Sequence, residues 1–117
     1  MRKAVTLIAG EFGSPHYGTR PHLEGAMRLT RKEAPTALYL GAASGDDAAF
    51  GSAMCALLGA AGAVDVYWPK LAKRRRDQSV ARKALDRVDF VFVGGGDVEA
   101  GMNVLRRAQL VLSLIHI

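Results

Sequence analysis

The chain has very little cysteine and no long apolar run, and each shortage restricts what it can be. One cysteine among 117 residues excludes an internal disulfide framework and suits a reducing compartment. No stretch approaches the roughly 18 consecutive apolar residues that a membrane span needs. The sequence therefore predicts a cytoplasmic protein without a membrane partner.

The composition is that of a folded domain with a moderate excess of positive charge. Half of the residues are hydrophobic and 23% are charged, which favours one packed domain over disorder. Sixteen Lys and Arg against eleven Asp and Glu give a formal charge of +5. That charge permits an anionic partner but does not require one.

Short apolar runs alternate with helical patterns along the chain. Strands are expected over 4–9, 36–40, 63–68 and 88–93. Helices are expected over 21–31, from Asp47 to about 59–62, over 80–87 and over 98–107. Strands alternating with helices predict an α/β domain with a three-layer, flavodoxin-like parallel sheet.

Four polar residues stand where N-terminal helix caps are expected. Either Asp46 or Asp47 can cap the second helix, Ser79 the third and Asp97 the fourth. Glu99 then falls in the first turn of the fourth helix, where the helix dipole favours an acid.

The triple glycine at Gly94–Gly96 lies between a strand and a helix, at the carboxyl edge of the predicted sheet, where ligands gather in such folds. Glycines let backbone N–H groups point outward together, which suits a phosphate or an oxyanion. The neighbouring Asp97 and Glu99 disfavour a phosphate, and the lysine of a P-loop is missing. A purely structural tight turn remains the alternative.

The stretch Val88–Met102, VDFVFVGGGDVEAGM, resembles the central motif of the serine peptidase family that includes dipeptidase E and cyanophycinase. This family belongs to the class I glutamine amidotransferase-like superfamily. The early strand, the run Leu38–Ser44 and the segment Tyr67–Pro69 also fit, so the resemblance extends to about Arg107. It implies a class I glutamine amidotransferase-like sheet and a parent enzyme that hydrolyses small peptides or amides through an acyl-enzyme, without a cofactor.

By position, the resemblance implies that the backbone N–H of Gly96 contributes to an oxyanion hole, and that Gly94 and Gly95 shape the turn. The family's nucleophilic serine lies about thirty residues further on in a strained elbow, and its histidine follows. Neither Ser113 nor His116 has the surroundings of such a group. We therefore expect a C-terminally truncated peptidase that is inactive as it stands.

The end of the chain has an unusual composition. Residues 1–107 read as the N-terminal part of one α/β domain, and 108–117 as an atypical tail. The segment Leu112–Ile117 is either a last strand or translated read-through from a sequencing adapter. A truncated sheet would expose an unpaired strand edge, which predicts aggregation or a homo-oligomer.

Several further polar residues are candidates for the site. Ser44 and Asp97 follow strands and could contact substrate at the carboxyl edge, and Arg20 could hold a substrate carboxylate. His16 and His22 match no metal-ligand spacing, so a polar loop is favoured over a metal site. Cys55 has no neighbouring base and is expected to pack within the second helix.

The segment from Lys70 to Gln78 is strongly basic, with Lys70, Lys73, Arg74, Arg75 and Arg76 in close succession. Such a run can bind nucleic-acid phosphates. No aromatic platform accompanies it and Asp77 interrupts it, which favours a solvated loop or a patch for an acidic substrate over nucleic acid.

Two other functions stay open beside the peptidase. One is a non-catalytic glutamine amidotransferase-like domain that binds a small metabolite at the sheet edge. The other is a basic α/β module whose anionic partner docks on Lys70–Arg76.

Overall fold

Three short parallel strands form the centre of the structure. In the computed structural model, which describes residues 20–115, β1 (Thr36–Leu40) lies between β2 (Asp65–Tyr67) and β3 (Phe90–Val93). Ala37 of β1 is level with Val66 of β2 and with Phe90 of β3. These strands confirm three of the predicted ones, although β2 and β3 are shorter than expected. The strand expected over 4–9 lies outside the described residues.

Side chains of β1 alternate between two cores, as the twofold period of a strand requires. Ala37 and Tyr39 face one side, and Leu38 and Leu40 face the other. Helices α1 (Arg20–Arg28) and α2 (Ala48–Ala60) cover the first side. The second side is covered from α3 (Asp77–Leu85), α4 (Val98–Arg107) and α5 (Val111–Ile115).

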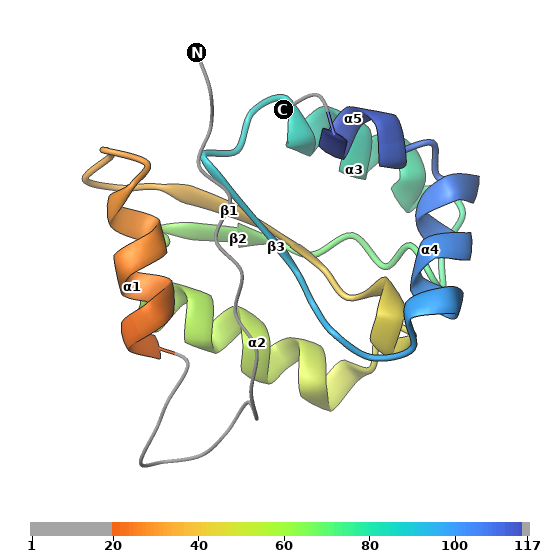
Figure 1. The fold of residues 1–117 in the computed structure, drawn as a ribbon, viewed down its shortest axis with the longest axis horizontal. Helices are drawn as coiled ribbons and strands as arrows, with labels where there is room; N and C mark the ends of the chain where they lie inside the picture. The colour runs from red at the N-terminus through yellow and green to blue at the C-terminus, as the bar shows by residue number, and fades with distance from the viewer. Residues whose placement is uncertain (1–19, 116–117) are drawn as a thin grey trace.

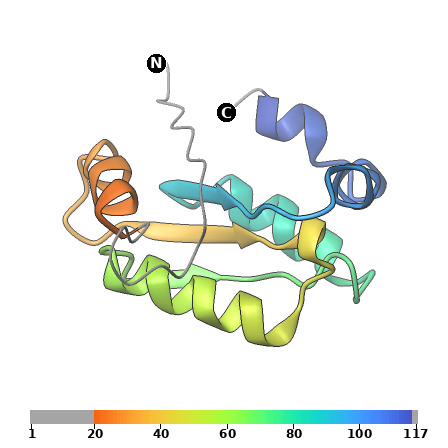
Figure 2. The same cartoon turned by 60° about the horizontal axis from the view of Figure 1, so that its bottom comes forward.

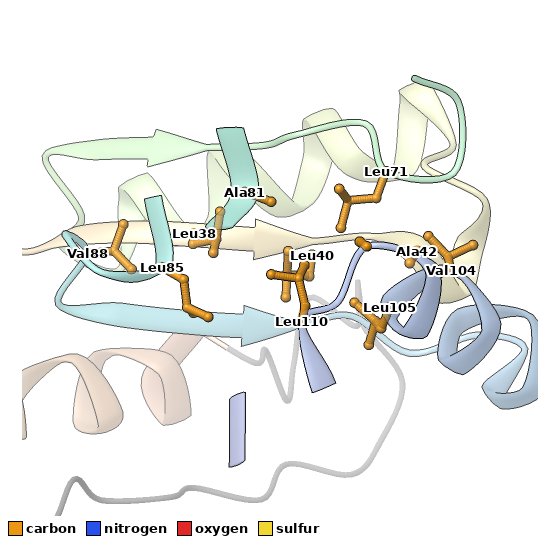
Figure 3. Close-up of a cluster of buried hydrophobic side chains, with 11 residues drawn as sticks. Leu38, Leu40, Ala42, Leu71, Ala81, Leu85, Val88, Val104, Leu105 and Leu110 are labelled. Carbon is orange, nitrogen blue, oxygen red and sulfur yellow. The ribbon is translucent and has the colours of Figure 1, made fainter. Parts of the chain in front are cut away.

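The two groups of helices therefore lie on opposite sides of the strands (Figure 1). A turned view shows α2 on one side and α4 and α5 on the other (Figure 2). Figure 3 shows the leucine-rich core beneath α3 and α4, whose buried members are Leu38, Leu40, Ala42, Leu71, Ala81, Leu85, Val88, Val104, Leu105, Ala108 and Leu110. This small compact α/β arrangement is compatible with a flavodoxin-like fold. No helix within residues 20–115 is long and apolar enough to cross a membrane.

The first helix ends earlier than the sequence predicts. Arg31 adopts a left-handed backbone with φ of 59°, which stops the helical path soon after Arg28. Leu23 and Met27 are buried on α1, whereas Leu29 beyond its end is 59% exposed. The predicted helix is thus confirmed, but its last apolar position lies outside the core.

The cap predicted at Ser79 is wrong. Helix α3 begins two residues earlier, at Asp77, and the Ser79 hydroxyl donates to the carbonyl of Arg76, 3.4 Å away. The Asp77 carboxylate accepts from the backbone N–H of Lys70 at 2.8 Å. Asp77 therefore closes the turn between Lys70 and the helix, and α3 begins at Asp77 itself instead of after Ser79.

The tail does not form a strand over the described part of Leu112–Ile117, so one of the two interpretations of this segment is wrong. Residues Val111–Ile115 are the helix α5, and the N–H of Leu114 donates to the carbonyl of Leu110 at 2.9 Å. Leu110 is fully buried in the leucine-rich core, and Val111 and Leu114 pack partly against it. Helical spacing brings these side chains to one face, which the alternation of a strand cannot do.

Two neighbouring aspartates after β1 have different structural roles. Asp47 is the cap of α2, because its carboxylate accepts from the N–H of Phe50 at 2.8 Å. Asp46 is buried, and its two oxygens accept from Trp68 Nε1 at 2.9 Å and from the N–H of Ala72 at 2.7 Å. Asp46 thereby ties the turn after β1 to the segment that follows β2.

Replacing these aspartates one at a time separates their two roles. Asp46→Ala leaves the indole N–H of Trp68 and the amide of Ala72 without their acceptor, so we expect a loss of about 2–4 kcal/mol in unfolding free energy. The matched variant Asp47→Ala removes one cap and should cost about 1 kcal/mol. Urea unfolding followed by circular dichroism measures both. Equal losses of unfolding free energy in the two variants would contradict the role of Asp46 in joining the turn after β1 to the segment after β2.

Candidate functional site

The glycine turn after β3 is fixed at one end to the last residue of β1 and at the other end to the turn that follows β1. The N–H of Gly94 donates to the carbonyl of Leu40 at 2.9 Å, which extends the pairing of the two strands. The N–H of Asp97 donates to the carbonyl of Ala43 at 2.8 Å. Ala43 belongs to the short 3-10 helix η1 (Ala42–Ser44). The glycine turn therefore lies at the carboxyl edge of the sheet, as predicted.

Glycine is required at one position of this turn by both backbone and packing. Gly96 has φ of +143°, a conformation that residues with a Cβ rarely adopt. A Cβ on Gly96 would also overlap the carbonyl group of Ala43. Gly95 differs, because a Cβ there would meet no atom within 4 Å. The close approach of the two turns thus depends on Gly96.

Two backbone amides of the turn have no acceptor among the described residues. Gly95 and Gly96 are both exposed, and neither N–H makes a hydrogen bond within residues 20–115. Their neighbours on either side, Gly94 and Asp97, use their amides to hold the turn in place. A turn that is held by its flanking residues and has N–H groups without an acceptor can donate these groups to an anionic oxygen.

Asp97 acts as the helix cap that the sequence predicts. Its carboxylate accepts from the N–H of Ala100 at 3.0 Å, and Glu99 follows in the first turn of α4. Both side chains are acidic and exposed beside the turn. Their negative charge makes this helix start a poor place for a phosphate, in agreement with the sequence argument.

The three candidate substrate residues are only partly brought together. Ser44 adjoins the glycine turn, and its hydroxyl donates to the carbonyl of Gly41 at 3.0 Å. Arg20 pairs with Glu24 at 2.7 Å and lines a different groove. That groove, of about 330 Å³, also contains Pro35 and Gly62, which precede β1 and β2. Arg20 therefore lies toward the amino edge of the sheet, away from Ser44 and Asp97.

The remaining candidates show no metal or nucleophile arrangement in the part of the chain that is described. His22 is exposed, His16 lies outside the described residues, and no cluster of three potential metal ligands occurs within residues 20–115. Cys55 lies partly buried in the middle of α2, where burial raises the pKa of its thiol and Lys70 acts weakly against this. A raised pKa leaves the thiol protonated and poorly nucleophilic at neutral pH.

Tyr39 is a feature of this edge that the sequence argument missed. Its ring is fully buried, packs edge-on against Trp68 with centroids 5.6 Å apart, and stacks on Phe92 at 6.3 Å. Its hydroxyl lies beneath Gly41 and Gly94, at 2.9 and 3.2 Å from where a Cβ on each would stand. No described residue within hydrogen-bond geometry partners this hydroxyl. The alternation of β1 predicts that Tyr39 is buried, but only the fold shows what lies above it.

The environment of Tyr39 favours the neutral phenol. Burial raises its pKa above the ordinary value of 10.0, and the carboxylate of Asp46 adds to this shift. The nearby Ser44 hydroxyl acts against the shift, although its hydrogen bond goes to the carbonyl of Gly41 and not to the phenol. The raised value means that the folded state keeps the proton at a pH where the unfolded chain releases it. This contribution to stability is complete below pH 10 and is lost as the pH rises further.

The glycine turn gives a matched pair of substitutions. Gly96→Ala forces a strained backbone against Ala43, and we expect it to lower the unfolding free energy by about 1–3 kcal/mol. Gly95→Ala has open space and should change stability by less than about 0.5 kcal/mol. Thermal and urea unfolding of both variants measure the difference. Comparable stability of the two variants would show that the close approach to Ala43 is not a constraint.

Alkaline unfolding tests the Tyr39 environment. In the wild type, the unfolding free energy should fall above pH 10 by up to about 1.4 kcal/mol per pH unit more steeply than in Tyr39→Phe. Below pH 9, Tyr39→Phe should be at least as stable as the wild type, since it removes a buried hydroxyl without a described partner. The exposed Tyr67→Phe is the matched control, because it removes a phenol hydroxyl at the surface. A Tyr39→Phe curve that coincides with the wild type would refute this account.

Comparison of the chain with protein-family models, with curated proteins and with solved structures found no match. Three observations define the carboxyl edge: the turn at Gly94–Gly96 is held at both ends, two of its amides have no described acceptor, and the buried phenol of Tyr39 lies beneath it.

Proposed function

We propose that the chain carries the oxyanion-binding part of a serine hydrolase resembling dipeptidase E, with a class I glutamine amidotransferase-like fold. The observation that carries the proposal is that Gly95 and Gly96 are exposed residues whose amides have no acceptor among the described residues, in a turn fixed on Ala43. The motif Val88–Met102 contributes the family resemblance. Because the donors are fixed in advance, they need no reorganisation when negative charge develops on a carbonyl oxygen.

Each described group would have a limited part in such a reaction. The amide of Gly96, with that of Gly95 beside it, would donate to the oxygen that becomes negative when an acyl group is attacked. Asp97 holds the first turn of α4, and so positions the donors without touching substrate. The compact 3-10 turn at Ser44 keeps the neighbouring backbone in place through its bond to Gly41.

The described serines do not supply a nucleophile in this proposal. Ser44 lies in a 3-10 turn, and its φ is not positive as in a strained elbow. Its hydroxyl donates to a carbonyl group, and no histidine contacts it among the described residues. Ser52 on α2 and Ser79 on α3 are exposed, and Ser113 belongs to the short helix α5. The proposed nucleophile and base therefore belong to further sequence of the parent protein.

The test begins with the reading frame beyond Arg107, read from the source DNA. We expect a Gly-x-Ser-Ala-Gly elbow about thirty residues after Gly96 and a histidine beyond it. The 117-residue chain alone should not react with a fluorophosphonate serine-hydrolase probe, whereas the longer protein should. A frame without the elbow would remove the hydrolase proposal and leave binding of a small metabolite at the same edge.

The longer protein then allows the oxyanion role to be measured. Gly96→Ala should lower kcat for a small peptide substrate by about 10²-fold or more. Gly95→Ala is the control for a backbone change in the same turn without overlap, and it should retain most of the activity. Thermal unfolding of both variants shows whether the turn has folded. A fully active Gly96→Ala enzyme would contradict the assignment.

A further inference from the structure

Positive charge is concentrated on one side of the molecule. Ten of the sixteen Lys and Arg residues fall in two stretches, 70–87 and 106–107. Only two acids, Asp77 and Asp86, lie within these stretches. Both stretches belong to the side of the sheet that α3 and α4 cover (Figure 1). Nine of these residues are together called the basic face: Lys73, Arg74, Arg75, Arg76, Arg82, Lys83, Arg87, Arg106 and Arg107.

A side-chain contact joins the two stretches. The guanidinium of Arg82 on α3 donates to the carbonyl of Ala108, which caps the C-terminal end of α4, at 2.9 Å. Arg106 and Arg107 immediately precede Ala108 and are exposed. Arginines of α3 and α4 therefore meet at the C-terminal end of α4. Because Arg82 and Arg106 are 24 residues apart in the sequence, the sequence alone does not show this grouping.

The charge of the basic face is not neutralised by the described residues. The salt bridge between Arg20 and Glu24, on the opposite side, is the only one within residues 20–115. The carboxylate of Asp77 accepts from the backbone of Lys70 and pairs with none of these arginines. Like charges held close together without partners repel one another and attract a polyanion.

We infer that the basic face binds the phosphate backbone of duplex nucleic acid without reading its sequence. Helix α3 has nine residues and is about 13 Å long, with cations before its start and near its end. A duplex presents one phosphate charge per roughly 1.7 Å of its axis, so several phosphates lie within reach of such a face. Most of these cations are arginines, whose forked N–H groups match phosphate oxygens.

The absence of aromatic residues on α3 and α4 indicates which kind of polyanion the basic face can bind. Neither helix, nor the turn Lys73–Arg76, contains Phe, Tyr or Trp. Single-stranded nucleic acid is held by stacking of its bases on aromatic rings, which this face does not offer. Protein partners are anchored by buried aromatic side chains, which it also lacks. On the sequence alone the missing aromatic platform disfavours nucleic acid, but this absence excludes base stacking only, and contacts to the phosphates of a duplex still fit the composition of the face. This inference is independent of the hydrolase proposal.

Fluorescence anisotropy with a labelled mixed-sequence DNA duplex tests the inference on the 117-residue chain. We expect micromolar binding at low salt that weakens steeply as salt rises. The variant Arg74→Gln/Arg75→Gln/Arg106→Gln should weaken binding at least tenfold and reduce the salt slope by about 2–3. These three side chains are exposed, so circular dichroism should show an unchanged fold.

A control variant removes the same charge from the other side of the molecule. Arg28→Gln/Arg31→Gln/Lys32→Gln changes three exposed cations at and just after the end of α1. This control should bind the duplex nearly as well as the wild type. If duplex binding weakened equally in both triple variants, the loss of affinity would follow from net charge alone, and the proposal would be overturned. Equally tight binding of polyglutamate, or no binding of the duplex at low salt, would also overturn it.

Discussion

The turn after β1 is the element on which the rest of the carboxyl edge depends. On one side, the carbonyl of Ala43 accepts from Asp97 and fixes the glycine turn. On the other side, the carboxylate of Asp46 accepts from Trp68 and Ala72 and fixes the segment after β2. Three chain segments that follow three different strands are thereby held in one arrangement. The strands bring these segments close, and the contacts of a single turn, residues 41–47, hold them together.

Local patterns predicted those parts of the structure that local interactions determine. The strand 36–40, the cap at Asp97 and the glycine turn follow from neighbouring residues, and the structure confirms them. Two features that the sequence did not predict depend on contacts that reach beyond the nearest neighbours, seven residues in one case and more than twenty in the other. Ser79 has the right side chain for a cap, yet Asp77 closes the preceding turn and starts the helix first. The role of Asp46 could not be predicted either, since its partners lie more than twenty residues away.

Helix α4 connects the two surfaces for which functions are proposed. Its N-terminal end follows the glycine turn, and its C-terminal end carries Arg106 and Arg107 beside Arg82. The charge along the helix changes from acidic at Glu99 to basic in the last turn, which matches the dipole of the helix at both ends. The same distribution separates the two proposed sites, because backbone amides would bind an oxyanion at one end of α4 and side chains would bind phosphates at the other.

Trp68 makes the carboxyl edge observable by spectroscopy. It is the only tryptophan of the chain, and its indole contacts the carboxylate of Asp46, the ring of Tyr39 and the ammonium of Lys70, 3.7 Å from the ring centroid. Charged groups close to an indole shift and quench its emission. The intrinsic fluorescence of the protein therefore reports on a single location, two strands away from the glycine turn. A molecule that displaces the turn after β1 becomes detectable without any added label.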